Sequence, residues 1–128
     1  MNENKDNVID DDDEWKQGMP VEPGTYSAKF LGAKPFEISE GQYAGKKWRW
    51  EFEIVSGEYT GRVVSGMSNR VLGKGSTAGR FMSGLLDRDL KPSDNVKAEM
   101  NSCVGKSFKV RYRKSDKGSS IGVQDIFQ

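Results

Sequence analysis

Cationic and aromatic residues lie side by side in one short stretch of the sequence. This stretch contains Lys46, Lys47, Trp48, Arg49 and Trp50. Cations neutralise phosphates, and the flat face of an aromatic ring can stack on an unpaired base. The combination indicates a surface that binds single-stranded nucleic acid.

The same stretch must also supply part of a hydrophobic core. Residues 47–54 alternate charged and apolar side chains at every position, which is the period of a half-buried strand. Trp50 and Phe52 lie in the middle of the apolar face, and we expect both in the core. The stronger candidates for stacking are the rings near the strand end and in the Gly-flanked turns, namely Tyr43, Trp48 and Tyr59.

Further cations lie in other parts of the chain. Residues 107–113 alternate again, and Lys109, Arg111 and Arg113 share the face opposite to the apolar residues. Lys74 precedes a predicted helix N-terminus, where backbone amides can also contact a phosphate. The alternative explanation is a solvated surface for the cations of residues 107–113 and a flexible connector for the segment that holds Lys74. The candidate nucleic-acid-binding residues are Tyr43, Lys46, Lys47, Trp48, Arg49, Tyr59, Arg62, Arg70, Lys74, Lys109, Arg111 and Arg113.

The composition argues against an enzyme. The chain has no histidine, so the commonest general base is absent, and Cys103 has no imidazole that could activate it. Glu51 and Glu53 lie beside Arg49 on an alternating strand, where a solvated, salt-bridged face is the expected role. The acidic run at residues 10–13 lacks the ligand spacing of a calcium loop. We therefore expect no catalytic residue, no metal and no cofactor.

Charge is distributed unevenly along the chain. Residues 1–14 hold seven acids and one lysine, which leaves 19 cations and 12 carboxylates, a formal charge of +7, for residues 15–128. A basic body favours a polyanionic partner. Residues 1–18 are predicted to form a disordered acidic tail, which could recruit a protein partner or contact the basic body, and residues 19–128 to form one domain. No apolar run is long enough to span a bilayer, and the acidic N-terminus does not resemble a signal peptide, so the expected location is the cytoplasm, with no membrane contact.

The pattern of elements predicts an all-β domain with one short helix. Strands are expected at residues 25–33, 47–54, 62–67, 107–113 and 120–127, and the helix between residues 76 and 90, with Ser76 or Thr77 as its N-cap. Three strands, a helix and two strands is the order of the five-stranded OB-type Greek-key barrel. A meander or a sandwich with one helix would give a similar order.

Several short motifs resemble a known group of proteins. Pro23-Gly24-Thr25-Tyr26, Trp50 to Ile54, Gly57 to Arg62 and Val104-Gly105-Lys106 occur in an order similar to that in small phage-encoded OB-fold proteins. The resemblance spans about residues 20–127. It implies a sequence-tolerant single-stranded-DNA-binding protein of phage DNA replication or recombination, which acts in the host cytoplasm and associates with itself. The acidic tails of such proteins are often C-terminal, whereas here the acidic segment is N-terminal.

A different function class remains open at this point. The basic faces could instead bind an acidic protein, which would make the chain an interaction module for a host replication or recombination factor. Binding to a labelled oligonucleotide that weakens with added salt would separate the two hypotheses.

Overall fold

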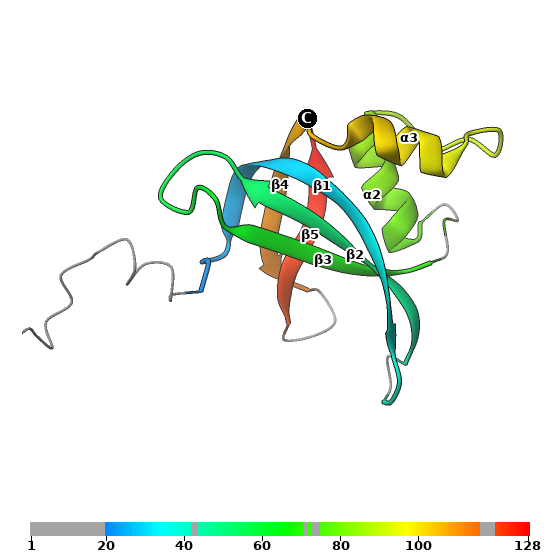
Figure 1. The fold of residues 1–128 in the computed structure, drawn as a ribbon, viewed down its shortest axis with the longest axis horizontal. Helices are drawn as coiled ribbons and strands as arrows, with labels where there is room; N and C mark the ends of the chain where they lie inside the picture. The colour runs from blue at the N-terminus through cyan, green and yellow to red at the C-terminus, as the bar shows by residue number, and fades with distance from the viewer. Residues whose placement is uncertain (1–19, 42–43, 71, 73–74, 116–119) are drawn as a thin grey trace, which may run out of the picture.

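The computed structural model describes residues 20–41, 44–70, 72, 75–115 and 120–128. This part of the chain forms five strands and two helices (Figure 1). In chain order they are β1 (Gly24–Ile38), β2 (Gly45–Ile54), β3 (Val63–Asn69), α2 (Thr77–Leu86), α3 (Val96–Cys103), β4 (Ser107–Lys114) and β5 (Ile121–Phe127). The predicted tail at residues 1–18 lies outside the described residues, as do Tyr43 and Lys74.

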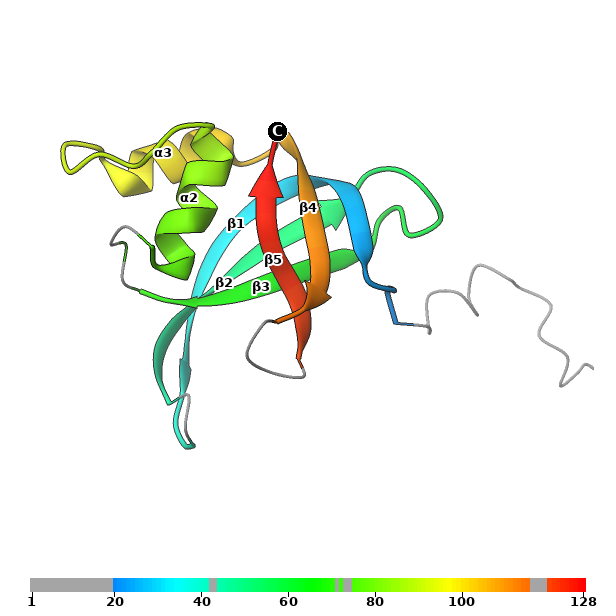
Figure 2. The same cartoon turned by 180° about the vertical axis from the view of Figure 1, so that it is seen from behind.

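The strands form one antiparallel sheet in the order β3-β2-β1-β4-β5. The sheet curls, so that β2 and β3 lie in front in Figure 1, whereas β4 and β5 lie in front in the opposite view of Figure 2. All five predicted strands are confirmed, with ends that differ by a few residues. The largest difference is at β1, which continues past its predicted end at Ala33 to Ile38.

β1 is bent, and its two halves have different partners. Residues 24–29 pair with β4, and residues 28–38 pair with β2. The register with β2 shifts between Phe30 and Gly32, and Gly32 has a φ of 122°, a conformation that residues with a side chain rarely adopt. A bulge of this kind bends a strand. The second half of β1 therefore leaves β4 and continues with β2 as a hairpin.

The core lies inside the curled sheet and under α2. Phe30, Trp50, Phe52 and Phe81 are fully or almost fully buried, which confirms the core positions predicted for Trp50 and Phe52. The ring centre of Phe30 lies 6.3 Å from that of Trp50 and 5.2 Å from that of Phe52. Phe81 of α2 packs edge-on against Trp50 at 5.4 Å. Two strands, β1 and β2, and the helix α2 are thus joined through one aromatic cluster.

The edge strands β3 and β5 approach each other closely, but the sheet is not closed. Among the described residues no hydrogen-bonded ladder joins them. A Cβ atom added to Gly66 would lie 2.4 Å from the carbonyl oxygen of Val123, and one added to Gly122 would lie 3.1 Å from that of Ser65. Glycine permits two backbones to come this close. Gly66 and Gly122 therefore set the spacing between the two edges.

α2 is the predicted helix, and it packs across the end of β5. Of the two expected N-cap candidates, Ser76 is the N-cap, because its Oγ accepts a hydrogen bond from the amide of Gly79 at 3.0 Å. The helix buries Phe81, Met82 and Leu85. A Cβ atom on Gly84 would lie 2.1 Å from the carbonyl oxygen of Ile126, so the helix backbone rests directly on β5 at this glycine.

α3 corrects the expectation of a single helix. Its N-cap is Asn95, whose side-chain oxygen accepts a hydrogen bond from the amide of Ala98 at 3.1 Å. Cys103 is the buried residue of this helix, and the thiol donates a long contact of 3.9 Å to the carbonyl of Leu85 in α2. A helix that buries so little has a weak apolar periodicity, which is the signal on which the sequence prediction depended.

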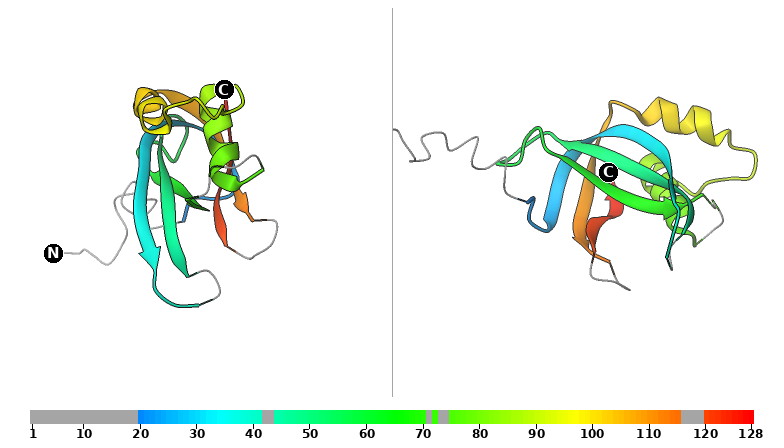
Figure 3. Two further views of the ribbon diagram at one scale, coloured as in Figure 1. Left: turned by 90° about the vertical axis from the view of Figure 1, so that its right-hand side faces the viewer. Right: turned by 60° about the horizontal axis from the view of Figure 1, so that its bottom comes forward.

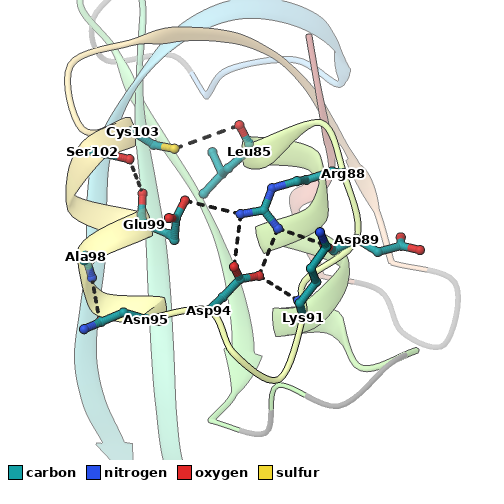
Figure 4. Close-up of polar contacts among 10 residues, drawn as sticks. All are labelled: Leu85, Arg88, Asp89, Lys91, Asp94, Asn95, Ala98, Glu99, Ser102 and Cys103. Atoms are coloured by element: carbon teal, nitrogen blue, oxygen red, sulfur yellow. Dashed lines mark hydrogen bonds and ion pairs between the residues drawn. The ribbon is translucent and has the colours of Figure 1, made fainter.

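An ion-pair network joins the two helices (Figure 4). The guanidinium of Arg88 donates to both carboxylate oxygens of Asp94, at 2.9 and 3.2 Å, and lies 3.6 Å from Glu99. The amide of Lys91 donates to the same carboxylate at 2.6 Å. The hydrogen bonds from Arg88 and then from the Lys91 amide lower the pKa of Asp94 below its usual range.

This network is expected to make stability depend on acid. The pKa of Asp94 is lowered in the folded state, so Asp94 contributes fully to the free energy of unfolding above the pKa of an unfolded aspartate. This contribution is lost as the pH falls through the pKa that Asp94 has in the folded protein. The difference in Tm between wild type and Asp94→Asn should therefore be positive near neutral pH and shrink as the pH falls below about 4, the pKa of an unfolded aspartate. The effect should be small, because the network is exposed to solvent. A Tm difference that grows as the pH falls would contradict the stabilising role given to the ionised Asp94.

Candidate nucleic-acid interface

The predicted binding residues that the structure describes do not form one continuous surface. One group lies on the outer face of the β1–β2 hairpin and the adjoining end of β3. Another lies on the outer face of β4. Seen from the side in Figure 3, β1 and β2 lie on one side of the molecule and β4 and β5 on the other. A short ligand can therefore occupy one group without touching the other.

We call the first group the hairpin surface. Its members share the outer face of the sheet because they are paired directly across neighbouring strands, or because they follow β3, and they are Lys34, Phe36, Lys47, Arg49, Met67, Asn69 and Arg70. The guanidinium of Arg49 lies over the ring of Phe36, 4.8 Å from its centre. Arg49 is exposed and has no carboxylate partner among the described residues. Met67, directly opposite Arg49 on β3, is 49% exposed.

Arg70 reinforces the base of this surface. Its Nε donates to the carbonyl of Lys47 at 3.1 Å, and Nη2 lies 3.3 Å from the carbonyl of Phe36. One guanidinium therefore bridges the backbones of β1 and β2. Since backbone carbonyls carry no net charge, the positive charge of Arg70 remains available to an anion.

Lys47 differs from the sequence expectation. It lies on the predicted polar face of β2, but it is only 9% exposed, and its ammonium donates to the side chain of Asn69 on β3. The methylene stem is covered because long cationic side chains pack along a surface and extend their charged end. Lys47 is therefore part of the supporting structure of the hairpin surface as well as a cation.

The other end of the same sheet face is electrically balanced. Glu51 lies 3.0 Å from the ammonium of Lys34, and Glu53 lies 3.9 Å from that of Lys29. Positive charge without a carboxylate partner is thus found near the hairpin, at Arg49 and Arg70, rather than along the full length of β2. A polyanion would approach this end of the face.

Trp48 occupies the inner side of the same hairpin. Its ring lies edge-on to that of Trp50, with centres 5.8 Å apart, and the residue is half-buried. It is paired with Pro35 of β1 and Ser68 of β3, at the end of the sheet next to the hairpin. Trp48 therefore remains a candidate for partial stacking, on the side of the hairpin opposite to Phe36. Lys46 is exposed next to it at the start of β2.

Tyr59 and Arg62 lie away from the hairpin surface, in the turn that joins β2 to β3. The ring of Tyr59 packs edge-on against Tyr26 at 5.8 Å, and its carbonyl accepts the amide of Arg62 at 2.9 Å. Burial, and then the proximity of Tyr59 and Glu22, raises the pKa of Tyr26. Tyr59 is thus engaged in packing, and the structure does not bring it together with Arg49.

The second group forms what we call the β4–β5 surface. It comprises Lys109, Arg111, Arg113, Asp125 and Phe127. Asp125 lies 3.6 Å from Arg111 and 3.4 Å from Arg113, so one carboxylate is shared by two guanidiniums. Arg111 also lies over the ring of Phe127 at 5.5 Å. The predicted basic row of β4 exists, and Asp125 neutralises part of it.

Phe36 is the residue that sequence reasoning missed. The first strand was expected to end at Ala33, so Phe36 was left outside it. In the structure Gly32 forms a bulge and Pro35 lies in the half of β1 that pairs with β2 alone, so the strand continues. The signal that was present is the spacing of Lys34, Phe36 and Ile38, which continues the alternation of a strand.

A cavity of about 420 Å³ lies elsewhere, beside the first half of α2. Leu72 and Leu90 supply apolar walls, and Arg80, Ser83 and Asp89 supply polar groups. Arg80 is already engaged, since its guanidinium donates to the carbonyl of Gln124 at 3.0 Å.

Within the described ranges, no group of three or more His, Cys, Asp or Glu residues is arranged to hold a metal ion. No helix in the described part is long and apolar enough to cross a bilayer.

No protein-family model, curated protein or solved structure matches this chain. The resemblance to phage-encoded OB-fold proteins therefore stays a prediction.

Proposed function

We propose that the protein binds single-stranded DNA without strong sequence preference and acts in phage DNA replication or recombination. The observation that carries this proposal is the pair formed by Arg49 and Phe36. An exposed cation without a carboxylate partner among the described residues lies on an aromatic ring, on the outer face of β1 and β2. Cations and aromatic faces together are what single strands require.

The arrangement of the strands supports an OB-type barrel as part of the same proposal. The order β3-β2-β1-β4-β5, the close approach of β3 to β5 and the position of both helices between β3 and β4 are all consistent with it. OB barrels are often partly open, and they bind oligonucleotides on the face of strands 2 and 3. In this chain that face includes Arg49 and Met67.

The proposed binding mode follows from the chemistry of the hairpin surface. The backbone phosphates would lie against Arg49 and Arg70, whose guanidiniums are held in place by Phe36 and by two carbonyls. A base would stack on the Phe36–Arg49 pair or cover Met67. Every base has a flat face, so such contacts discriminate weakly between sequences. A duplex keeps its bases stacked inside, and it would offer the surface phosphates alone.

An oligonucleotide titration tests this proposal. We expect a fluorescent oligo-dT to bind more tightly than a duplex of equal length. Its affinity should fall with salt, with a log–log slope of about −0.7 for each phosphate neutralised. Arg49→Gln should weaken binding and make the slope shallower by about the same amount, since it removes one cation.

A matched variant separates a local contact from overall charge. Lys97→Gln removes one exposed cation from α3, away from the hairpin surface, and should leave the affinity nearly unchanged. Equal binding of duplex and single strand, or equal losses in the two variants, would exclude the proposed site. In that case the hairpin surface would be left for an acidic protein partner.

A further inference from the structure

The cavity of about 420 Å³ beside the first half of α2 lies close to one end of the hairpin surface. Its volume is within the range of roughly 300–1,000 Å³ that is typical of small-molecule sites. Leu72 forms part of its wall and follows Arg70 by two residues, which span about 7 Å at most. Figures 1 and 2 both show the first turn of α2 beside the end of β3. A DNA strand that passes Arg70 would therefore reach the cavity within a few nucleotides.

Leucine side chains and glycine backbone form the apolar part of the cavity lining. Leu72 and Leu90 are both half-buried, and Gly75 and Gly79 present no side chain. Such a lining suits a flat heterocycle, because the faces of the ring are apolar and a glycine allows a close approach to the backbone. The polar groups of the lining then determine which heterocycle fits.

Arg80 brings a positive charge to this lining, and no carboxylate among the described residues pairs with it. Its Nη2 donates to the carbonyl of Gln124 at 3.0 Å, and the guanidinium lies 5.9 Å from the centre of the Phe81 ring. These contacts hold the guanidinium in place, but the carbonyl uses only one of its N–H groups. The others can donate to acceptor atoms of a ligand.

Asp89 brings a negative charge to the same lining. Within the described part of the chain, its carboxylate forms no ion pair or hydrogen bond. The neighbouring cation, Arg88, is engaged with Asp94 and Glu99. Figure 4 shows the carboxylate of Asp89 turned away from that network. The cavity thus combines a guanidinium, a carboxylate and the hydroxyl of Ser83.

Guanine is the DNA base whose edges match these groups best. Its N1–H and its amino group can both donate to one carboxylate, and its O6 and N7 accept from a guanidinium. Adenine and cytosine each offer the carboxylate a single amino group beside an acceptor nitrogen. Thymine has a carbonyl oxygen on either side of its one N–H, so it repels a carboxylate.

We infer that this cavity binds one base of the DNA strand held on the hairpin surface, and that it favours guanine. Asp89 accepts from the donor edge of the base, and Arg80 donates to its acceptor edge. Leu72 and Leu90 cover its faces. The inference rests on the proposed function, and it adds a preference at one position to binding that otherwise tolerates any sequence. Because sequence-tolerant contacts allow the protein to shift along a strand, a single guanine is enough to fill the cavity.

A titration with two oligonucleotides of equal length tests this preference. One is oligo-dT, and the other is the same oligonucleotide with a single central dG. We expect the second to bind the full-length protein at least about 5-fold more tightly, the smallest discrimination expected of one good pair of hydrogen bonds. Asp89→Asn should bring the ratio of the two affinities close to one, because an amide has one acceptor and adds a donor.

Asp87→Asn is the matched control. It removes the same charge from a residue outside the cavity lining, at the C-cap of α2, where φ is 56° and asparagine is well tolerated. Either variant can tighten binding in general by reducing the repulsion of phosphates, so the ratio of affinities is the decisive measurement. We expect Asp87→Asn to keep the wild-type ratio. A wild-type ratio of one, a ratio that Asp89→Asn leaves unchanged, or equal losses in the two variants would overturn the inference.

Free mononucleotides separate the failure of this inference from the failure of the proposed function. At millimolar concentration, dGMP should shift the methyl NMR signals of Leu72 and Leu90, whereas dTMP, which carries the same phosphate, should not. Asp89→Asn should abolish the shifts. If the shifts appear but oligo-dT does not bind, the proposed function fails and the guanine site stands. If oligo-dT binds but neither the ratio nor the shifts distinguish guanine, the proposed function stands and the inference fails, which leaves the cavity for a side chain of a protein partner.

Discussion

Trp50→Ala is expected to unfold the domain or to lower its stability by roughly 3–5 kcal/mol, the range for the removal of a buried large aromatic side chain. Trp50 is 0% exposed and packs against both Phe30 and Phe81. Its indole nitrogen also donates to the hydroxyl of Ser68 at 2.8 Å, so the substitution leaves a buried hydroxyl without this donor. Thermal or urea unfolding, monitored by far-ultraviolet circular dichroism, measures the loss.

Trp48→Ala is the matched control for this substitution. Trp48 is the same residue type on the same face of β2, but it is half-buried at the end of the sheet next to the hairpin. We expect it to cost clearly less stability than Trp50→Ala. Equal losses for the two variants, or an unchanged Tm for Trp50→Ala, would show that the core is assigned to the wrong face of β2.

Phe36→Ala is expected to weaken binding to oligo-dT by about 5- to 150-fold, which corresponds to the roughly 1–3 kcal/mol of one stacked base. The substitution removes the ring and also the platform that holds the guanidinium of Arg49. Phe36 is half-buried on the outer face of the hairpin and outside the aromatic cluster of the core, so the domain should remain folded. Equilibrium titration of a labelled oligonucleotide, together with the Tm, provides both measurements.

Two further variants make this second prediction specific. Phe36→Trp keeps a flat ring at the same position and should restore most of the affinity. Phe127→Ala removes a comparable ring under Arg111 on the β4–β5 surface, and should leave DNA affinity nearly unchanged. Weaker binding by Phe127→Ala with no effect of Phe36→Ala would place the DNA on the opposite side of the molecule.

Local periodicity was sufficient to predict most of the fold. The alternation in residues 47–54 and 107–113 depends on neighbouring residues alone, and it correctly indicated both strands and the buried face of Trp50. The N-cap was narrowed to Ser76 or Thr77 for the same reason, because a hydroxyl before an apolar period is a local signal, and the structure selects Ser76. Features of this kind do not require knowledge of the strand order.

Features that depend on strand pairing could not be predicted in the same way. Lys47 is covered because Asn69 of β3 lies opposite it, and the two residues are far apart in the sequence. Asp125 neutralises part of the β4 row because β5 pairs with β4 in a particular register. Phe36 is a site residue because β1 passes through the bulge at Gly32 and continues past Pro35, paired with β2. α3 was missed because a helix that buries little has a weak apolar period.

The bulge in β1 also separates the half of the strand that joins the rest of the sheet from the half that forms the hairpin. Beyond Ala33, β1 pairs with β2 alone, and β3 pairs with β2 only as far as Lys47, so the tip of the hairpin projects from the sheet with a length independent of β4 and β5. Because side chains alternate with a period of two, adding or removing residue pairs at this tip preserves which residues face outward. A change of one residue in one strand would shift the register and turn Phe36 or Arg49 inward. Inserting or deleting residue pairs at this tip would therefore change the extent of the outer surface without repacking the aromatic core.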